Sequence, residues 1–204
     1  MDIARLDNLL LELTDSERAY CAGARYDWND AFRQGQQADI DGRHVRKIGN
    51  AAYALHQEGM PEGLSIVRNS RFNPVPEHVH DYVEISYVYR GSAPQVVNGT
   101  QLTLAQNEVL LLDAACPHAV GELGEHDLML SIVISRPMLR RSLEQSLSST
   151  SAVSQFLLNA LNDETDHRGH VHFRTGASRR VRRYIQEMLC ELLEPTAASA
   201  PIVS

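Results

Sequence analysis

The sequence predicts a mainly β protein, with one antiparallel β-barrel or sandwich and α-helices before and after it. From Leu64 to Ile134, short β-type runs alternate with turn residues at close and even spacing. On both sides of this region, apolar residues recur at helical spacing instead. We therefore expect three regions in the 204 residues: a helical extension at 1–60, a barrel at 61–136, and linker or dimerisation helices at 137–204.

The N-terminal region carries two helix signals and a weaker third. A leucine-rich stripe at Leu6 to Leu13 keeps helical spacing, and we expect it to be core or interface. Thr14 to Glu17, "TDSE", has the form of a capping box that opens a second helix. A third helix is predicted over His44 to Glu58, where Gly59 and Pro61 would end it.

The barrel region divides into short strand-like runs. Asn98-Gly99 separates two alternating runs, and this dipeptide favours the tight turn of a hairpin because both central positions need positive φ. The sequence contains no internal repeat. They read LSIVR, HVHDYVEISYVYR, PQVVNGTQLTL, NEVLLLD, PHAVGEL and DLMLSIVIS.

After Arg136 the pattern becomes helical again. Pro137 suits the start of a helix, and a second helix is predicted over Val153 to Leu161. "HVHFR" reads as a last strand. Ala177 to Glu194 is predicted to be an amphipathic helix, because its large apolar residues fall on one side.

Composition excludes several classes of protein. The net charge of −7 argues against a large nucleic-acid surface, since phosphates are contacted by clustered Lys and Arg. The basic run Arg179 to Arg183 reads as a solvated helix face. No apolar run is long enough to span a membrane, and the three scattered cysteines imply no disulfide framework. We expect a cytoplasmic protein.

Residues with metal-binding chemistry gather in one strand-like run. His78, His80 and Glu84 have equal parity, so in a strand their side chains point to the same face. Two imidazoles and one carboxylate form a metal-ligand set, and His118, at the start of a later run, is a candidate fourth ligand. These donors suit Zn, Ni, Cu, Mn or Fe without selecting one.

The two faces of the same run are expected to differ. Tyr82 and Ser86 share the parity of the candidate ligands and would line a ligand pocket. Ile85, Tyr87 and Tyr89 face the other way and are too apolar for water, so a covering helix or a partner subunit is expected.

The run from His78 to Gly91, H-x-H-x3-E-x6-G, resembles the first motif of the cupin barrel. The run at 107–122 resembles the second motif and keeps His118, but Asn107 stands where that motif has its first glycine. Phe72 likewise stands where the first motif has its leading glycine. The resemblance implies a cupin (jelly-roll) barrel in which the ligand positions are filled and the turn positions have changed.

The pattern from His78 to His118 is similar, more narrowly, to the N-terminal sensor of AraC-type transcription regulators. This resemblance implies a homodimer that binds a small-molecule effector, such as a sugar, inside the barrel. In that family helix-turn-helix motifs follow and contact DNA. None follows here before Ser204, so we expect a truncated sensor whose DNA contacts come from a missing C-terminal domain.

Alternative interpretations remain open at this point. The four candidate ligands can be an inherited cupin pattern that holds no metal, with the imidazoles satisfied by hydrogen bonds. A stand-alone metal-dependent cupin enzyme, a dioxygenase or an isomerase, also fits the ligand set. A binding barrel with neither metal nor regulatory role is the third reading. The sequence favours the sensor, and we do not expect an enzyme.

Overall fold

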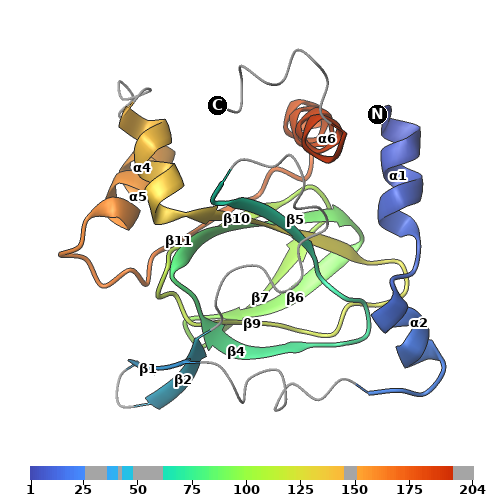
Figure 1. Ribbon diagram of the computed structural model, residues 1–204, viewed down its shortest axis with the longest axis horizontal. Helices are drawn as coiled ribbons and strands as arrows, with labels where there is room; N and C mark the ends of the chain where they lie inside the picture. Colours follow the sequence, from blue (N-terminus) through green and yellow to red (C-terminus); the bar gives the residue numbers. More distant parts are fainter. Residues whose placement is uncertain (26–35, 41–42, 48–61, 145–150, 195–204) are drawn as a thin grey trace.

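The structure is a computed structural model that describes residues 1–25, 36–40, 43–47, 62–144 and 151–194. Its centre is a barrel made of two facing sheets (Figure 1). One sheet has six strands, whose order is β1 (Gln36–Ile40), β2 (Arg43–Lys47), β4 (Val75–Val79), β9 (His118–Val120), β6 (Ser92–Val97) and β7 (Thr100–Ala105).

The second sheet has five strands and carries the helices on its outer side. Its order is β11 (His170–Phe173), β8 (Val109–Leu112), β5 (Tyr82–Arg90), β10 (Leu128–Ser135) and β3 (Leu64–Arg68). All its pairings are antiparallel, whereas β2 pairs with β4 in parallel in the other sheet. This arrangement confirms the predicted fold class, a mainly β barrel of cupin type with flanking helices.

Five helices are described around the barrel: α1 (Ile3–Leu11), α2 (Asp15–Cys21), α4 (Arg136–Glu144), α5 (Ala152–Leu161) and α6 (Arg179–Leu193). Figure 1 shows α1 and α6 on one side of the barrel and α4 beside α5 at another edge. The capping box predicted at the start of α2 is present, because Glu17 N donates to Thr14 Oγ1 and Thr14 N donates to Glu17 Oε2. The helices predicted around 153–161 and 177–194 are confirmed as α5 and α6.

Side chains of β5 alternate between two separate cores. Val88 points into the barrel and packs with Leu110, Leu112 and other interior residues. Tyr87 points outward into a second core, which includes Leu189 of α6. The prediction that the apolar outer face of β5 needs a cover is confirmed. Its cover is a set of helices from both ends of the chain, which supply Leu6, Leu10, Leu139, Phe156, Ala160, Leu189 and Cys190 to the same core.

A buried ion cluster fastens α2 to the barrel. The Glu17 carboxylate is fully buried and accepts hydrogen bonds from Arg68 Nη2 at 2.8 Å and from Arg71 Nε at 3.0 Å. The same guanidinium groups donate to carbonyl oxygens at the end of α1, among them those of Leu10 and Glu12. Burial raises the pKa of Glu17, but the hydrogen bonds and charges of Arg71, Thr14 and Arg68 outweigh it and lower the pKa from 4.5 to about 2.

The prediction of a helix over His44 to Glu58 is wrong for the part that the structure describes. His44 to Lys47 lie in β2, which pairs with β1 and, in parallel, with β4. Pairing with an available strand edge outweighs the weak helical propensity of a five-residue segment. Residues 48–58 lie outside the described residues. The division of the chain at 61 and 136 stays a prediction, although β1 and β2 extend the six-stranded sheet from the N-terminal side.

Two positions at which the cupin motifs have glycine keep a backbone that favours glycine. Phe72 has φ of 71° and Asn107 has φ of 65°, both in the left-handed region. The Phe72 ring stacks on Tyr20 of α2, with 5.2 Å between ring centroids. At the predicted hairpin, Asn98 and Gly99 both have positive φ, and Val97 pairs with Thr100 across the turn. Phe72 and Asn107 thus have a left-handed backbone although neither residue is glycine.

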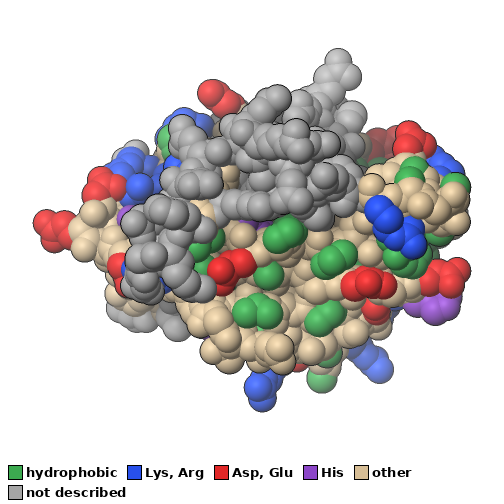
Figure 2. Space-filling model, turned by 90° about the horizontal axis from the view of Figure 1, so that it is seen from below, with side chains coloured by type: hydrophobic (Ala, Val, Ile, Leu, Met, Phe, Trp, Pro, Cys, Tyr) green, Lys and Arg blue, Asp and Glu red, His purple; other side chains and the backbone are tan. Residues whose placement is uncertain are grey.

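The surface opposite α6 differs from the helix-covered side. Figure 2 shows that its hydrophobic side chains are scattered among charged ones and form no continuous apolar patch in the described part of that view. Among the described residues, no helix combines the length and the apolar character that crossing a bilayer requires.

Candidate metal and effector site

The four predicted ligands come from three strands and one turn. His78 lies in β4, His80 in the turn that follows, Glu84 in β5, and His118 is the first residue of β9. We predicted that His78, His80 and Glu84 share one strand, but β4 and β5 belong to different sheets. The chain changes sheet at His80 and Asp81, and all four candidate ligands remain buried.

Three of the four candidates bring donor atoms together. The Nε2 atoms of His80 and His118 lie 3.4 and 3.8 Å from Glu84 Oε2. One ligand atom from each of these three residues lies within 4.8 Å of the others. His78 is not part of this set, although its ring packs against that of His118 with 4.1 Å between centroids. The described residues thus form a triad beside which His78 stands.

Backbone contacts set the tautomers of two histidines. His78 Nδ1 lies 2.8 Å from the Pro76 carbonyl oxygen, and His118 Nδ1 lies 3.0 Å from that of Cys116. A carbonyl oxygen can only accept, so each Nδ1 carries the proton and donates. The Nε2 atoms then present lone pairs, as metal-ligating imidazoles do when a backbone carbonyl orients them.

His80 is buried without a hydrogen bond. Neither of its ring nitrogens has a hydrogen-bond partner among the described residues, and its contact with Glu84 lacks hydrogen-bond geometry. Its ring instead stacks on Tyr82, with 4.0 Å between centroids and 11° between planes. An unsatisfied buried polar group costs about 1–3 kcal/mol, so something outside the described structure is needed to satisfy this imidazole.

The charge state of the site matches a cation. Burial raises the pKa of Glu84, but His80, His118 and a hydrogen bond from Ser131 outweigh it and hold that pKa below its usual range. Ser86 Oγ also donates to Glu84 Oε1 at 2.9 Å. Burial lowers the pKa of His118 to about 4 and that of His78 well below 6.5, so both rings are neutral at pH 7. One carboxylate beside the neutral imidazole of His118 suits a divalent metal.

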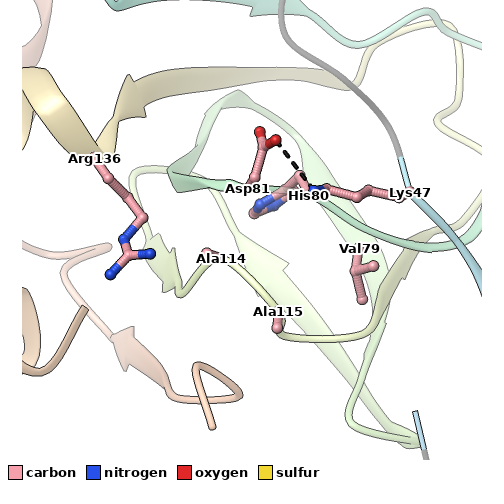
Figure 3. A pocket seen from close by; sticks show the side chains of 7 residues that line it. All are labelled: Lys47, Val79, His80, Asp81, Ala114, Ala115 and Arg136. Carbon is pink, nitrogen blue, oxygen red and sulfur yellow. Dashed lines mark ion pairs between the residues drawn. The ribbon is translucent and has the colours of Figure 1, made fainter. Parts of the chain in front are cut away.

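A pocket of about 220 Å³ opens at the same end of the barrel (Figure 3). His80 lines it, and Figure 3 shows Lys47 and Arg136 on opposite sides of that ring. Asp81 also lines it and forms an ion pair with Lys47 at 3.2 Å. Among the described residues, Val79, Ala114 and Ala115 supply its apolar side chains.

The two predicted pocket residues have other contacts. Tyr82 stacks on His80, and Ser86 orients Glu84, but neither is among the described residues that line the 220 Å³ pocket. Sequence reasoning missed Lys47 and Arg136. Lys47 falls in the segment predicted as helix, and Arg136 was interpreted only as the end of the barrel. No local pattern marks either residue, because β2 and α4 place them beside His80 through long-range pairing.

The family model described as "AraC-like ligand binding domain" matches residues 67–201. No curated protein matches the sequence significantly. The residues that match the family model include the barrel strands from β4 onward and the helices that follow them.

Several solved structures are similar to the chain. ToxT from Vibrio cholerae O395, bound to (E)-4-(8-methylnaphthalen-1-yl)but-3-enoic acid, is 12% identical over 65% of this chain and 48% of that chain, with a TM-score of 0.42. A cupin superfamily protein from Desulfitobacterium hafniense DCB-2 is 22% identical over 40% of this chain and 73% of that one, with a TM-score of 0.34. KdgF from Halomonas sp. is 18% identical over 37% and 73%, with the same TM-score of 0.34. The chain thus spans about half the length of the ToxT chain.

Proposed function

The chain belongs to the family of AraC-like ligand binding domains, and from this premise we propose that it is the effector-sensing and dimerisation domain of an AraC-type transcription regulator. One observation carries the proposal: the unsatisfied His80 lies between a buried donor set and an open pocket. A metal or an effector that enters the barrel would give this imidazole a partner.

We propose further that His80, Glu84 and His118 hold a divalent metal, with His78 as the fourth candidate ligand. A bound metal would supply a Lewis acid with open positions for an oxygen atom of the effector. The protein's own residues prepare the site. Ser86 fixes the Glu84 carboxylate, and Tyr82 holds the His80 ring by stacking.

Elemental analysis of protein purified without a His-tag tests the metal. We expect near-stoichiometric Zn, Mn, Ni or Fe in the parent after reconstitution, and loss of that metal in His80→Ala. The exposed His126 offers a matched control, because His126→Ala removes an imidazole that is not part of the triad. Absence of metal from the reconstituted parent would refute the metal proposal and leave an organic effector as the ligand.

Sensing would work as a population shift. β10 runs directly into α4, and the outer face of β5 packs on helices from both ends of the chain. A ligand that binds one helix arrangement better than another shifts the equilibrium toward it by its difference in affinity. In the whole regulator this arrangement would set the positions of helix-turn-helix domains that contact DNA, while this acidic domain would not contact DNA itself.

We propose that dimers form through the outer stripe of α6. Arg180, Arg183, Tyr184, Glu187 and Glu191 follow one another at helical spacing, with Tyr184 69% exposed. The stripe is basic in its first half and acidic in its second. An antiparallel copy would therefore place arginines against glutamates around the tyrosine, which is a self-complementary contact suited to two-fold symmetry.

Sedimentation equilibrium tests this dimer. Tyr184→Glu would place a carboxylate at the centre of the stripe, and we expect it to convert dimer to monomer at micromolar concentration. The control is Leu9→Glu on α1, which is also exposed but lies outside the stripe. An unchanged dimer in Tyr184→Glu would refute this interface.

The second candidate function is a metal-dependent cupin enzyme, a dioxygenase or an isomerase. The observation that favours it is the triad itself, since two imidazoles and a carboxylate are also the ligand set of non-haem iron oxygenases. Oxygen consumption by the iron-loaded protein with a panel of small substrates tests the dioxygenase. Turnover that is lost in Glu84→Ala would support the enzyme over the sensor.

A further inference from the structure

We propose that the pocket beside His80 takes a small organic anion of the carboxylate class, held between Lys47 and Arg136. This inference rests on the proposed sensing function and names the chemistry of its effector. It is carried by the described lining of the pocket, which combines two cationic side chains with a buried imidazole that has no hydrogen-bond partner.

Among the contacts of the described residues, each of the two cations makes fewer hydrogen bonds and ion pairs than it has N–H donors. Lys47 has three N–H donors and makes one ion pair, with Asp81 at 3.2 Å. Arg136 has five, of which Nε donates to the Ala160 carbonyl at 3.2 Å and Nη2 to Asp163 at 2.5 Å. Their side chains are 30% and 28% exposed, so an incoming carboxylate reaches them without full desolvation of either charge.

The remaining lining selects a small ligand with an apolar part. Val79, Ala114 and Ala115 present only apolar side chains to the cavity. Its volume of about 220 Å³ lies below the ~300–1,000 Å³ of pockets for drug-sized ligands. A carboxylate on a short aliphatic or aromatic body fits these dimensions, whereas a long chain does not.

The charges in the pocket favour an anion over a cation or a neutral molecule. Among the described residues, Lys47 and Arg136 line it together with one carboxylate, that of Asp81. Asp81 is 60% exposed and lies beside His80 in the turn between the sheets, so it can turn toward water when a ligand carboxylate replaces it on Lys47. A neutral ligand would leave the Lys47–Asp81 pair in place and gain less from either cation.

Arg136 also connects the pocket to the helices. It is the first residue of α4, and its guanidinium contacts the end of α5 at Ala160 and, just beyond it, Asp163. A carboxylate bound to Arg136 competes with these contacts. Arg136 would thus both bind the anion and hold α4 against α5.

Isothermal titration with benzoate and butyrate, against the neutral isosteres benzamide and butyramide, tests the proposal. The titration uses the full chain with a chelator present, so that a metal at His80 offers no competing anion site. Lys47→Gln and Arg136→Gln each remove one cation, and Arg140→Gln is the matched control on α4 outside the described lining. Thermal unfolding of each variant confirms that it is folded.

We expect at least one carboxylate to bind, with its amide roughly tenfold weaker or more, since hydrogen bonds between two charged groups are stronger than those to a neutral amide. Lys47→Gln and Arg136→Gln should each weaken carboxylate binding by a similar factor, and Arg140→Gln should not. Equal binding of acid and amide, unaffected by the variants, would overturn the anion proposal and leave the sensing function standing. Absence of binding by all four probes would also overturn it, while the metal and dimer measurements decide the proposed function independently.

Discussion

Two buried polar clusters in this molecule differ in how well their groups are paired. At Glu17, both carboxylate oxygens accept hydrogen bonds from Arg71, and Oε2 also accepts one from Arg68. In the barrel, His80 contacts Glu84 and His118 but makes no hydrogen bond with a described residue. The first cluster joins the helices to the barrel, and the second lies beside a pocket. The difference agrees with a stabilising role for the first cluster and with the proposed binding role for the second.

The largest expected effect comes from breaking the paired cluster. Glu17→Ala leaves two arginines buried without their carboxylate, and we expect a loss of about 3–5 kcal/mol in the free energy of unfolding. Urea denaturation followed by circular dichroism measures this loss. The control is Glu12→Ala, which removes an exposed carboxylate from the same stretch. A Glu17→Ala midpoint within error of the parent would show that the cluster does not fasten α2.

Acid should weaken the same cluster. The pKa of Glu17 is lowered on folding from 4.5 to about 2, so its ionic contribution is complete above pH 4.5 and is lost as the pH falls toward 2. The full shift corresponds to at most about 3 kcal/mol. Denaturation at pH 6, 4 and 2.5 should show a steeper fall for the parent than for Glu17→Gln. Parallel curves would contradict the assigned ion pairs.

A smaller loss of stability is expected at Ser86, which supports Glu84 of the proposed metal triad. Ser86→Ala removes the hydroxyl that donates to Glu84 Oε1, and we expect a loss of about 1–2 kcal/mol in stability. It should also weaken metal binding about 10- to 100-fold, because such supporting hydrogen bonds orient ligands. Competition with a chromogenic chelator measures the affinity. Unchanged affinity would mean that Ser131 alone orients the carboxylate.

The smallest change in the free energy of unfolding is expected at His80. Here we expect a gain in stability and not a loss. His80→Phe replaces an unsatisfied imidazole by an apolar ring that can keep the stacking on Tyr82. In metal-free protein we expect stability to stay equal or to rise by about 1 kcal/mol, while metal binding is lost. Thermal unfolding with and without a chelator checks both. A clear loss of stability in metal-free protein would mean that His80 has a structural role, and the comparison between the clusters would fail.

Several parts of the fold could be read from local sequence. Asn98-Gly99 predicted a hairpin because few residue pairs tolerate positive φ at both positions, and both have it. The capping box at Thr14 predicted the start of α2 for a similarly local reason. The alternation in β5 predicted an inner face with Glu84 and an outer face that needs a cover, because side chains in a strand alternate.

Other features depend on residues that are distant in sequence. The segment at His44 was predicted as helix, but it forms a strand because β4 offers it an edge. Nothing local indicates that Glu17, interpreted as a capping residue, also pairs with Arg68 and Arg71. These placements follow from pairing between elements, which composition and spacing do not encode.

The sequence by itself determined the barrel, the covering helices and the residue types of the site, because strand and helix periods are set by backbone geometry over a few residues. The tertiary structure alone decided that the chain changes sheet at His80, and that His80, Glu84 and His118 meet while His78 stands beside them. It also placed Lys47 and Arg136 at the same pocket. The physical reason is that side-chain distances across a barrel depend on the register of strands far apart in the chain, and local periodicity carries no information about that register.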